Sequence, residues 1–212
     1  MGQMLGTFEP LSIASLNILR QHSGDGGRAK NNTDVSNVIK YMESLLSNVN
    51  PSDSTLLIAP LHTSFRDFLT DPKRSGKFYI NLDNIHGRLA CATLRTMQEM
   101  LRFNICELET SYYLNSEVPD LEERIEKFIP PALSYSCRFW ADHLARVPRF
   151  DADMFEGLRL LMEEHFWFWL EVLSVRGEIP LAMMALVSLR KQLGHMQDNV
   201  SVPSIVLPCL QR

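Results

Sequence analysis

A histidine at the start of a predicted helix is the residue of this chain best placed to do chemistry. His62 lies in the string LHTSFRDFL (residues 61–69), directly after the apolar run LLIA (residues 56–59). The run predicts a short strand and the string predicts an amphipathic helix, so His62 falls in the first turn of that helix. Terminal helix amides and a ring N–H can both donate to a phosphate. The same histidine could equally serve the fold alone, as the residue that begins the helix.

A nucleotide-hydrolysing core is not predicted. A P-loop needs the pattern G-x-x-x-x-G-K-[ST], because glycine amides surround the phosphates and the lysine neutralises them. The glycine cluster at residues 24–27 leads to Arg28 and Lys30 without that pattern, and the pair Gly76-Lys77 is followed by Phe78.

The chain also lacks the patterns of a metal site or a hydrolase. It contains no H-E-x-x-H and no G-x-S-x-G. Glu163 and His165 fall on opposite sides of a predicted helix, so we interpret His165 as a core histidine. Asp67 or Glu164 as a general base would have no companion nucleophile. We therefore predict no catalytic residue, no metal ligand and no enzyme.

Four cysteines, Cys91, Cys106, Cys137 and Cys209, are spread without a C-x-x-C pair. Such residues behave as small hydrophobic side chains, so we predict core packing rather than disulfides or zinc binding. This usage favours a reducing, cytoplasmic setting.

Composition narrows the class of protein further. The 212 residues are 45% hydrophobic and 22% charged, which is ordinary for a globular chain with a core. A formal net charge of -4 gives no support for nucleic-acid binding. No apolar stretch approaches the ~20 residues of a membrane span, so we predict neither a nucleic acid nor a membrane as partner.

Residues 1–82 are predicted to form a winged-helix-like unit with a short β-hairpin. Ser12 is a plausible cap for a first helix with Ile13, Leu16 and Leu19 on its apolar face. Further apolar residues at helical spacing predict a second helix over 34–46. The strands are predicted at 56–59 and 78–80, on either side of the helix at 61–69.

From residue 83 the periodicity is helical, which makes the fold class mainly α. An all-α, hairpin-stack domain is predicted over 83–197, followed by an irregular tail at 198–212. Its expected helices are these: 83–102, 120–128, one begun by Pro130-Pro131, 153–175 ended by Gly177, and 179–195.

Several strings together resemble one known family. They are FEPLSI (8–13), LHTSFRDFL (61–69), NICEL (104–108), IPPAL (129–133), YSCRFWADHL (135–144) and HFWFWL (165–170). The likeness, over roughly residues 4–195, is to the region that follows the NACHT core in fungal NACHT/WD-repeat proteins. These belong to the STAND class of signalling NTPases and are NLR-like.

The resemblance implies a winged-helix module and a helical arm between a NACHT ATPase and a sensor array. His62 stands where the family's winged-helix histidine can contact the β-phosphate of bound ADP. Because this chain shows no NACHT core before Met1 and no repeat array after His195, we expect no cofactor of its own. ADP or ATP would bind only if the chain were joined to such a core.

Two functions are therefore carried forward. The first is a non-catalytic regulatory and interaction fragment of a STAND signalling protein, whose protein partner is a nucleotide-binding core or a sensor region. The second is a winged-helix DNA-binding regulator. Its recognition helix at 34–46 would offer only Lys40 to the groove, with Glu43 beside it.

Overall fold

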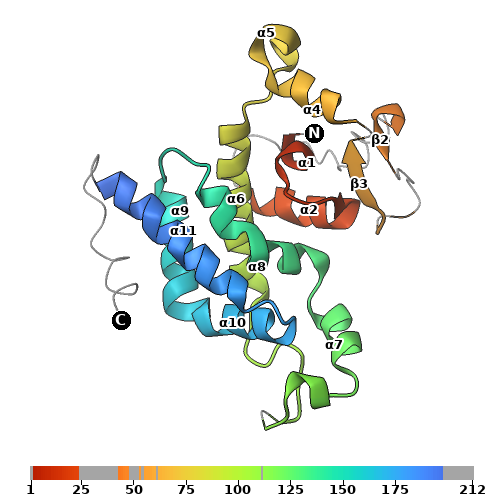
Figure 1. Cartoon of the computed structure of the whole chain (residues 1–212), viewed down its shortest axis with the longest axis vertical. Helices are drawn as coiled ribbons and strands as arrows, with labels where there is room; N and C mark the ends of the chain where they lie inside the picture. The colour runs from red at the N-terminus through yellow and green to blue at the C-terminus, as the bar shows by residue number, and fades with distance from the viewer. Residues whose placement is uncertain are drawn as a thin grey trace.

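The chain folds mainly into helices, with one small antiparallel sheet of three strands, as the sequence predicts (Figure 1). A computed structural model describes residues 2–23, 43–47, 53, 55–60, 62–110 and 112–197. The sheet lies with the N-terminal helices at one end of the molecule, α8 and α9 pack along α6, and α10 and α11 pack against α8 (Figure 1).

The N-terminal elements combine two helices with the three strands of the sheet. They are α1 (Gly2–Gly6), β1 (Leu11–Ser12), α2 (Ile13–His22), the 3-10 turn η1 (Glu43–Leu45), β2 (Leu46–Ser47) and β3 (Leu57–Pro60). The last strand is central, in the order β1-β3-β2, with Leu11 opposite Ile58 and Leu46 opposite Pro60. Residues 34–42 of the second predicted helix lie outside the described residues.

The start of α2 confirms the predicted cap. Ser12 Oγ accepts a hydrogen bond from the backbone N–H of Ser15 at 3.2 Å. Ile13, Leu16 and Leu19 are buried on the inner face of the helix. The cap fixes the direction in which the chain leaves β1.

Removing this cap should weaken the N-terminal unit measurably. Ser12→Ala leaves the Ser15 amide without its acceptor in a buried place, so we expect a loss of about 1 kcal/mol of unfolding free energy. Urea titration followed by circular dichroism measures it. Ser12→Thr keeps the hydroxyl and is the control, and an equal loss in both variants would show that the hydroxyl does not matter.

One predicted strand and the end of one predicted helix were wrong. Residues 78–80 form no strand. Gly76 (φ 52°) opens the 3-10 turn η2 (Gly76–Phe78), in which Tyr79 N donates to Gly76 O at 3.1 Å. The helix predicted over 34–46 was wrong for its last residues, because Glu43–Leu45 form the 3-10 turn η1 and Leu46 pairs with Pro60 and is buried as part of the sheet. The hairpin is therefore made by β2 and β3.

Two short helices connect the sheet to the rest of the chain. They are α4 (Thr63–Thr70), close to the predicted 61–69, and α5 (Pro72–Ser75). Asp71 accepts from Lys73 N at 2.9 Å and caps α5. This helix ends at the glycine that opens η2.

Except for a short 3-10 turn at 115–117, which was not predicted, the remaining helices agree with the predicted positions to within a few residues. They are α6 (Leu82–Met100), η3 (Asn115–Glu117), α7 (Leu121–Phe128), α8 (Pro131–Leu144), α9 (Ala152–Leu160), the π-helical η4 (Leu161–His165), α10 (Phe166–Val175) and α11 (Pro180–Gln197). The π turn interrupts the single helix predicted over 153–175. Gly177, with φ 69°, ends α10 as predicted.

Helix α6 contributes to both hydrophobic cores. Leu89 and Ala92 belong to the core of the N-terminal unit, with Tyr135 of α8. Leu94 and Met97 belong to the larger core of the helical part. The proposed division of the chain at residue 82 stays a prediction, but the first core extends beyond that position.

Candidate functional site

His62 lies at the N-cap of α4, directly after the central strand. Its backbone is extended, with φ -145° and ψ 142°, and its Nδ1 accepts from Ser64 N at 3.1 Å. Nδ1 also lies 2.8 Å from the hydroxyl of Ser64. An accepting Nδ1 places the proton of the neutral ring on Nε2. His62 is exposed, and its Nε2 has no partner among the described residues.

This arrangement is compatible with both interpretations of His62, as the residue that begins α4 and as a donor to a phosphate. Nδ1 of the ring forms the helix cap, and Nε2 keeps an N–H without a partner among the described residues. A neutral imidazole can therefore hold the start of α4 and donate to an anion at the same time.

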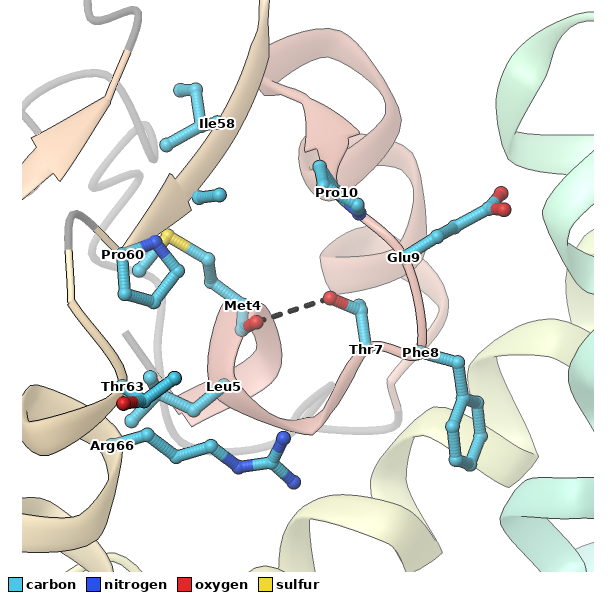
Figure 2. Close-up of a pocket in the computed structure, with 11 residues that line it drawn as sticks. Met4, Leu5, Thr7, Phe8, Glu9, Pro10, Ile58, Pro60, Thr63 and Arg66 are labelled. Carbon is cyan, nitrogen blue, oxygen red and sulfur yellow. Dashed lines mark hydrogen bonds between the residues drawn. The ribbon is translucent and has the colours of Figure 1, made fainter.

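A cavity lies beside the first turn of α4. It has a volume of about 210 Å³, between α1, residues 7–10, β3 and α4. Thr63 and Arg66 line it from α4, and Met4, Ile58 and Pro60 supply apolar walls (Figure 2). The residue after His62 is thus part of the cavity wall.

A second polar cluster is buried between α6 and α8. His86 Nδ1 lies 3.0 Å from His143 Nδ1, and His143 Nε2 lies 2.7 Å from the hydroxyl of Tyr135. That hydroxyl accepts from Phe8 N at 3.3 Å. If Tyr135 donates to His143 Nε2, then His143 Nδ1 donates to His86 Nδ1, and a continuous series of hydrogen bonds runs from Phe8 N to His86.

Burial keeps both histidines neutral. Burial, together with the neighbouring His86 and Arg146, lowers the pKa of His143 to about 3. Burial also lowers the pKa of His86 to about 4, helped by Arg146 and Arg66 and opposed by Asp83. Because both rings stay neutral, we interpret the cluster as a structural contact that holds Phe8, α6 and α8 together rather than as an acid–base site.

Sequence reasoning missed this cluster. Tyr135 and His143 are eight residues apart on one helix, which places them on one face, and that spacing could have indicated their contact. His86 is 57 residues from His143 in the sequence. Nothing in a single sequence connects the two.

The other candidates do not come together. Asp67 lies on α4 and Glu164 on the π turn before α10, at different ends of the molecule, and both are exposed (Figure 1). Glu163 pairs with Arg159 at 2.6 Å, whereas His165 is half-buried with its ring edge towards Phe168. Within the described part of the chain, no three His, Cys, Asp or Glu residues group closely enough to hold a metal ion.

Two cysteines confirm the core interpretation. Cys106 and Cys137 are buried, and Cys91 is half-buried. Burial raises the pKa of Cys91 to about 11 and raises that of Cys137 strongly, so neither supplies a thiolate near neutral pH. Cys209 lies outside the described residues.

Comparisons with known proteins identify no relative of this chain. No family model, no curated protein and no solved structure matches this chain. None of the helices that the structure describes is long and apolar enough to cross a membrane.

Proposed function

We propose that the chain is a non-catalytic regulatory and interaction part of a NACHT-type STAND signalling protein. It acts on a nucleotide-binding core supplied by another segment or another chain, in the cytoplasm. The observation that carries the proposal is the exposed His62 at the start of the helix after the last strand of a winged-helix-like unit. Its Nε2–H is left for a ligand.

Two further features support the proposal. The strand order β1-β3-β2 is the one that a winged helix requires. His62 is fixed by its bond to Ser64 N, so the ring needs little reordering to meet a phosphate. Among the described residues it stands apart from the buried histidines, whose rings are enclosed between α6 and α8.

The mechanism is a shift between two states of the nucleotide-binding core. A phosphate contact from His62 present only in the closed, ADP-bound state would favour that state. Linkage requires the reverse as well, so bound ADP would strengthen the binding of this chain to the core.

We expect this chain to tighten ADP binding by a separately produced NACHT core, and both His62→Asn and His62→Ala to remove most of that gain. One hydrogen bond to a charged group corresponds to roughly tenfold or more in affinity. Calorimetric titration of ADP into the core, with and without each form of this chain, measures the effect.

His62→Asn is the sharper of the two variants. An asparagine oxygen can replace Nδ1 as the acceptor for Ser64 N, since asparagine is a good N-cap, but its amide N–H groups lie closer to the backbone than Nε2 and do not reach the same position. This variant should therefore fold like the wild type and still lose the ADP effect. Unchanged ADP affinity with His62→Asn would refute the phosphate contact.

The DNA-binding alternative has little in its favour. Most of its recognition helix, residues 34–42, lies outside the described residues, and the chain carries a formal net charge of -4. A salt-dependent gel shift on random duplex DNA would be needed to restore it.

A further inference from the structure

The cavity beside α4 contains a cation whose charge is not neutralised within the described part of the chain. Arg66 lines the cavity and is exposed, and its guanidinium makes no hydrogen bond or ion pair to the described residues. Figure 2 shows the side chain extending from α4 past Leu5 towards the side of Phe8.

The carboxylate on the cavity wall is already engaged. Glu9 forms an ion pair with Arg138 of α8 and points away from Arg66 (Figure 2). A second guanidinium, that of Arg146, lies 4.4 Å from the centre of the Phe8 ring and donates to the backbone oxygen of Asp142. The charge left facing the cavity is therefore positive.

The size of the cavity limits what enters it. Pockets that hold drug-sized ligands measure roughly 300–1,000 Å³, whereas this one measures about 210 Å³. It is large enough for one or two side chains. Pro10 and Pro60 line it and are not fully buried, so they offer an apolar surface to an aliphatic side chain (Figure 2).

The geometry points to a docking site for an acidic–aliphatic peptide segment of a partner protein. Its aliphatic side chain lies against Pro10 and Pro60, and its Asp or Glu carboxylate pairs with Arg66. Charge complementarity selects this occupant, because a carboxylate matches a guanidinium with two parallel hydrogen bonds. The inference rests on the proposed function only in assigning the segment to the nucleotide-binding core.

A displayed library of random hexapeptides tests the site without prior choice of a partner. We expect selection on the wild-type chain, with depletion on Arg66→Glu, to enrich peptides in which an aliphatic residue neighbours Asp or Glu. No enrichment, or peptides that bind Arg66→Glu equally well, would overturn the inference.

Synthetic peptides then isolate the contact. The affinity of the best peptide should fall about tenfold or more with Arg66→Gln, and similarly when its carboxylate is replaced by an amide. Combining the two changes should cost no more than either alone, as a double-mutant cycle requires for a direct pair. Full additivity would refute the pairing.

Lys77→Gln is the matched control. Lys77 is an exposed cation on η2, close to α4 in the sequence, and it does not line the cavity. This variant should bind the peptide like the wild type, and an equal loss would show that only the general charge of the surface matters. Circular dichroism checks that all variants are folded.

The two proposals fail separately. If His62→Asn loses the ADP effect while Arg66→Gln binds peptide like the wild type, the docking site is wrong and the proposed function stands. If peptide binding depends on Arg66 but no form of the chain alters ADP affinity, the docking site stands without the nucleotide role.

Discussion

Replacing Trp169 by alanine should lower the free energy of unfolding by about 3–5 kcal/mol. Trp169 is fully buried in the larger core, where its ring meets Trp140 edge-on at 5.5 Å. Its Nε1 donates to the backbone oxygen of Cys137 at 2.9 Å. The substitution leaves a large cavity and removes one of the hydrogen bonds to the carbonyl of Cys137. Urea unfolding followed by tryptophan fluorescence and circular dichroism measures the loss.

The same helix supplies a matched control. Trp167 lies two residues away and is 75% exposed. Trp167→Ala should therefore change stability by no more than about 0.5 kcal/mol. Equal losses in the two variants would contradict the packing of α10 described above, because the two side chains would then be equally buried.

Stability should fall as the pH drops from about 6.5, with the buried histidines as the cause. In the unfolded chain a histidine binds a proton near pH 6.5, whereas the folded values are about 4 for His86 and about 3 for His143. Their contribution is therefore complete above pH 6.5 and is lost as the pH falls towards the folded values. The slope is about 1.4 kcal/mol per pH unit for each histidine.

His143→Gln separates this effect from the general response to acid. Above pH 7 the variant should be less stable than the wild type by a constant amount, because neither form carries a charged imidazole at these positions. Below pH 6.5 the gap should narrow, since the wild type has two such rings to protonate and the variant has one. Stability curves that stay parallel from pH 8 to 4.5 would refute the assignment.

Strong helical periodicity was enough to predict most of the helical part. The apolar faces of α2 and α6, the cap at Ser12 and the stop at Gly177 are local features, and the structure confirms them. The strands depend on distant partners. Leu46 becomes a strand residue only because Pro60 lies opposite it, and Phe78 and Tyr79 have a β-type composition but no partner strand.

The candidate site also has features that local sequence predicts and features that it does not. A strand followed by an amphipathic helix predicted where His62 lies, but not which of its nitrogens would cap α4. The positive charge of the cavity follows from an ion pair between residues 129 positions apart, Glu9 and Arg138. No local pattern contains that information, so Arg66 could not be singled out from the sequence.

The shared use of α6 limits how the molecule can move. Ala92 and Leu94, two residues apart and so on opposite sides of the helix, are buried in separate cores, and turning the helix about its axis would disrupt both at once. Reorientation of the helical arm must therefore come from hinges at the ends of α6, near Asn81 and Leu101, where its backbone becomes extended. A displacement at one end of α6 would then reach the other end as a tilt of the whole helix.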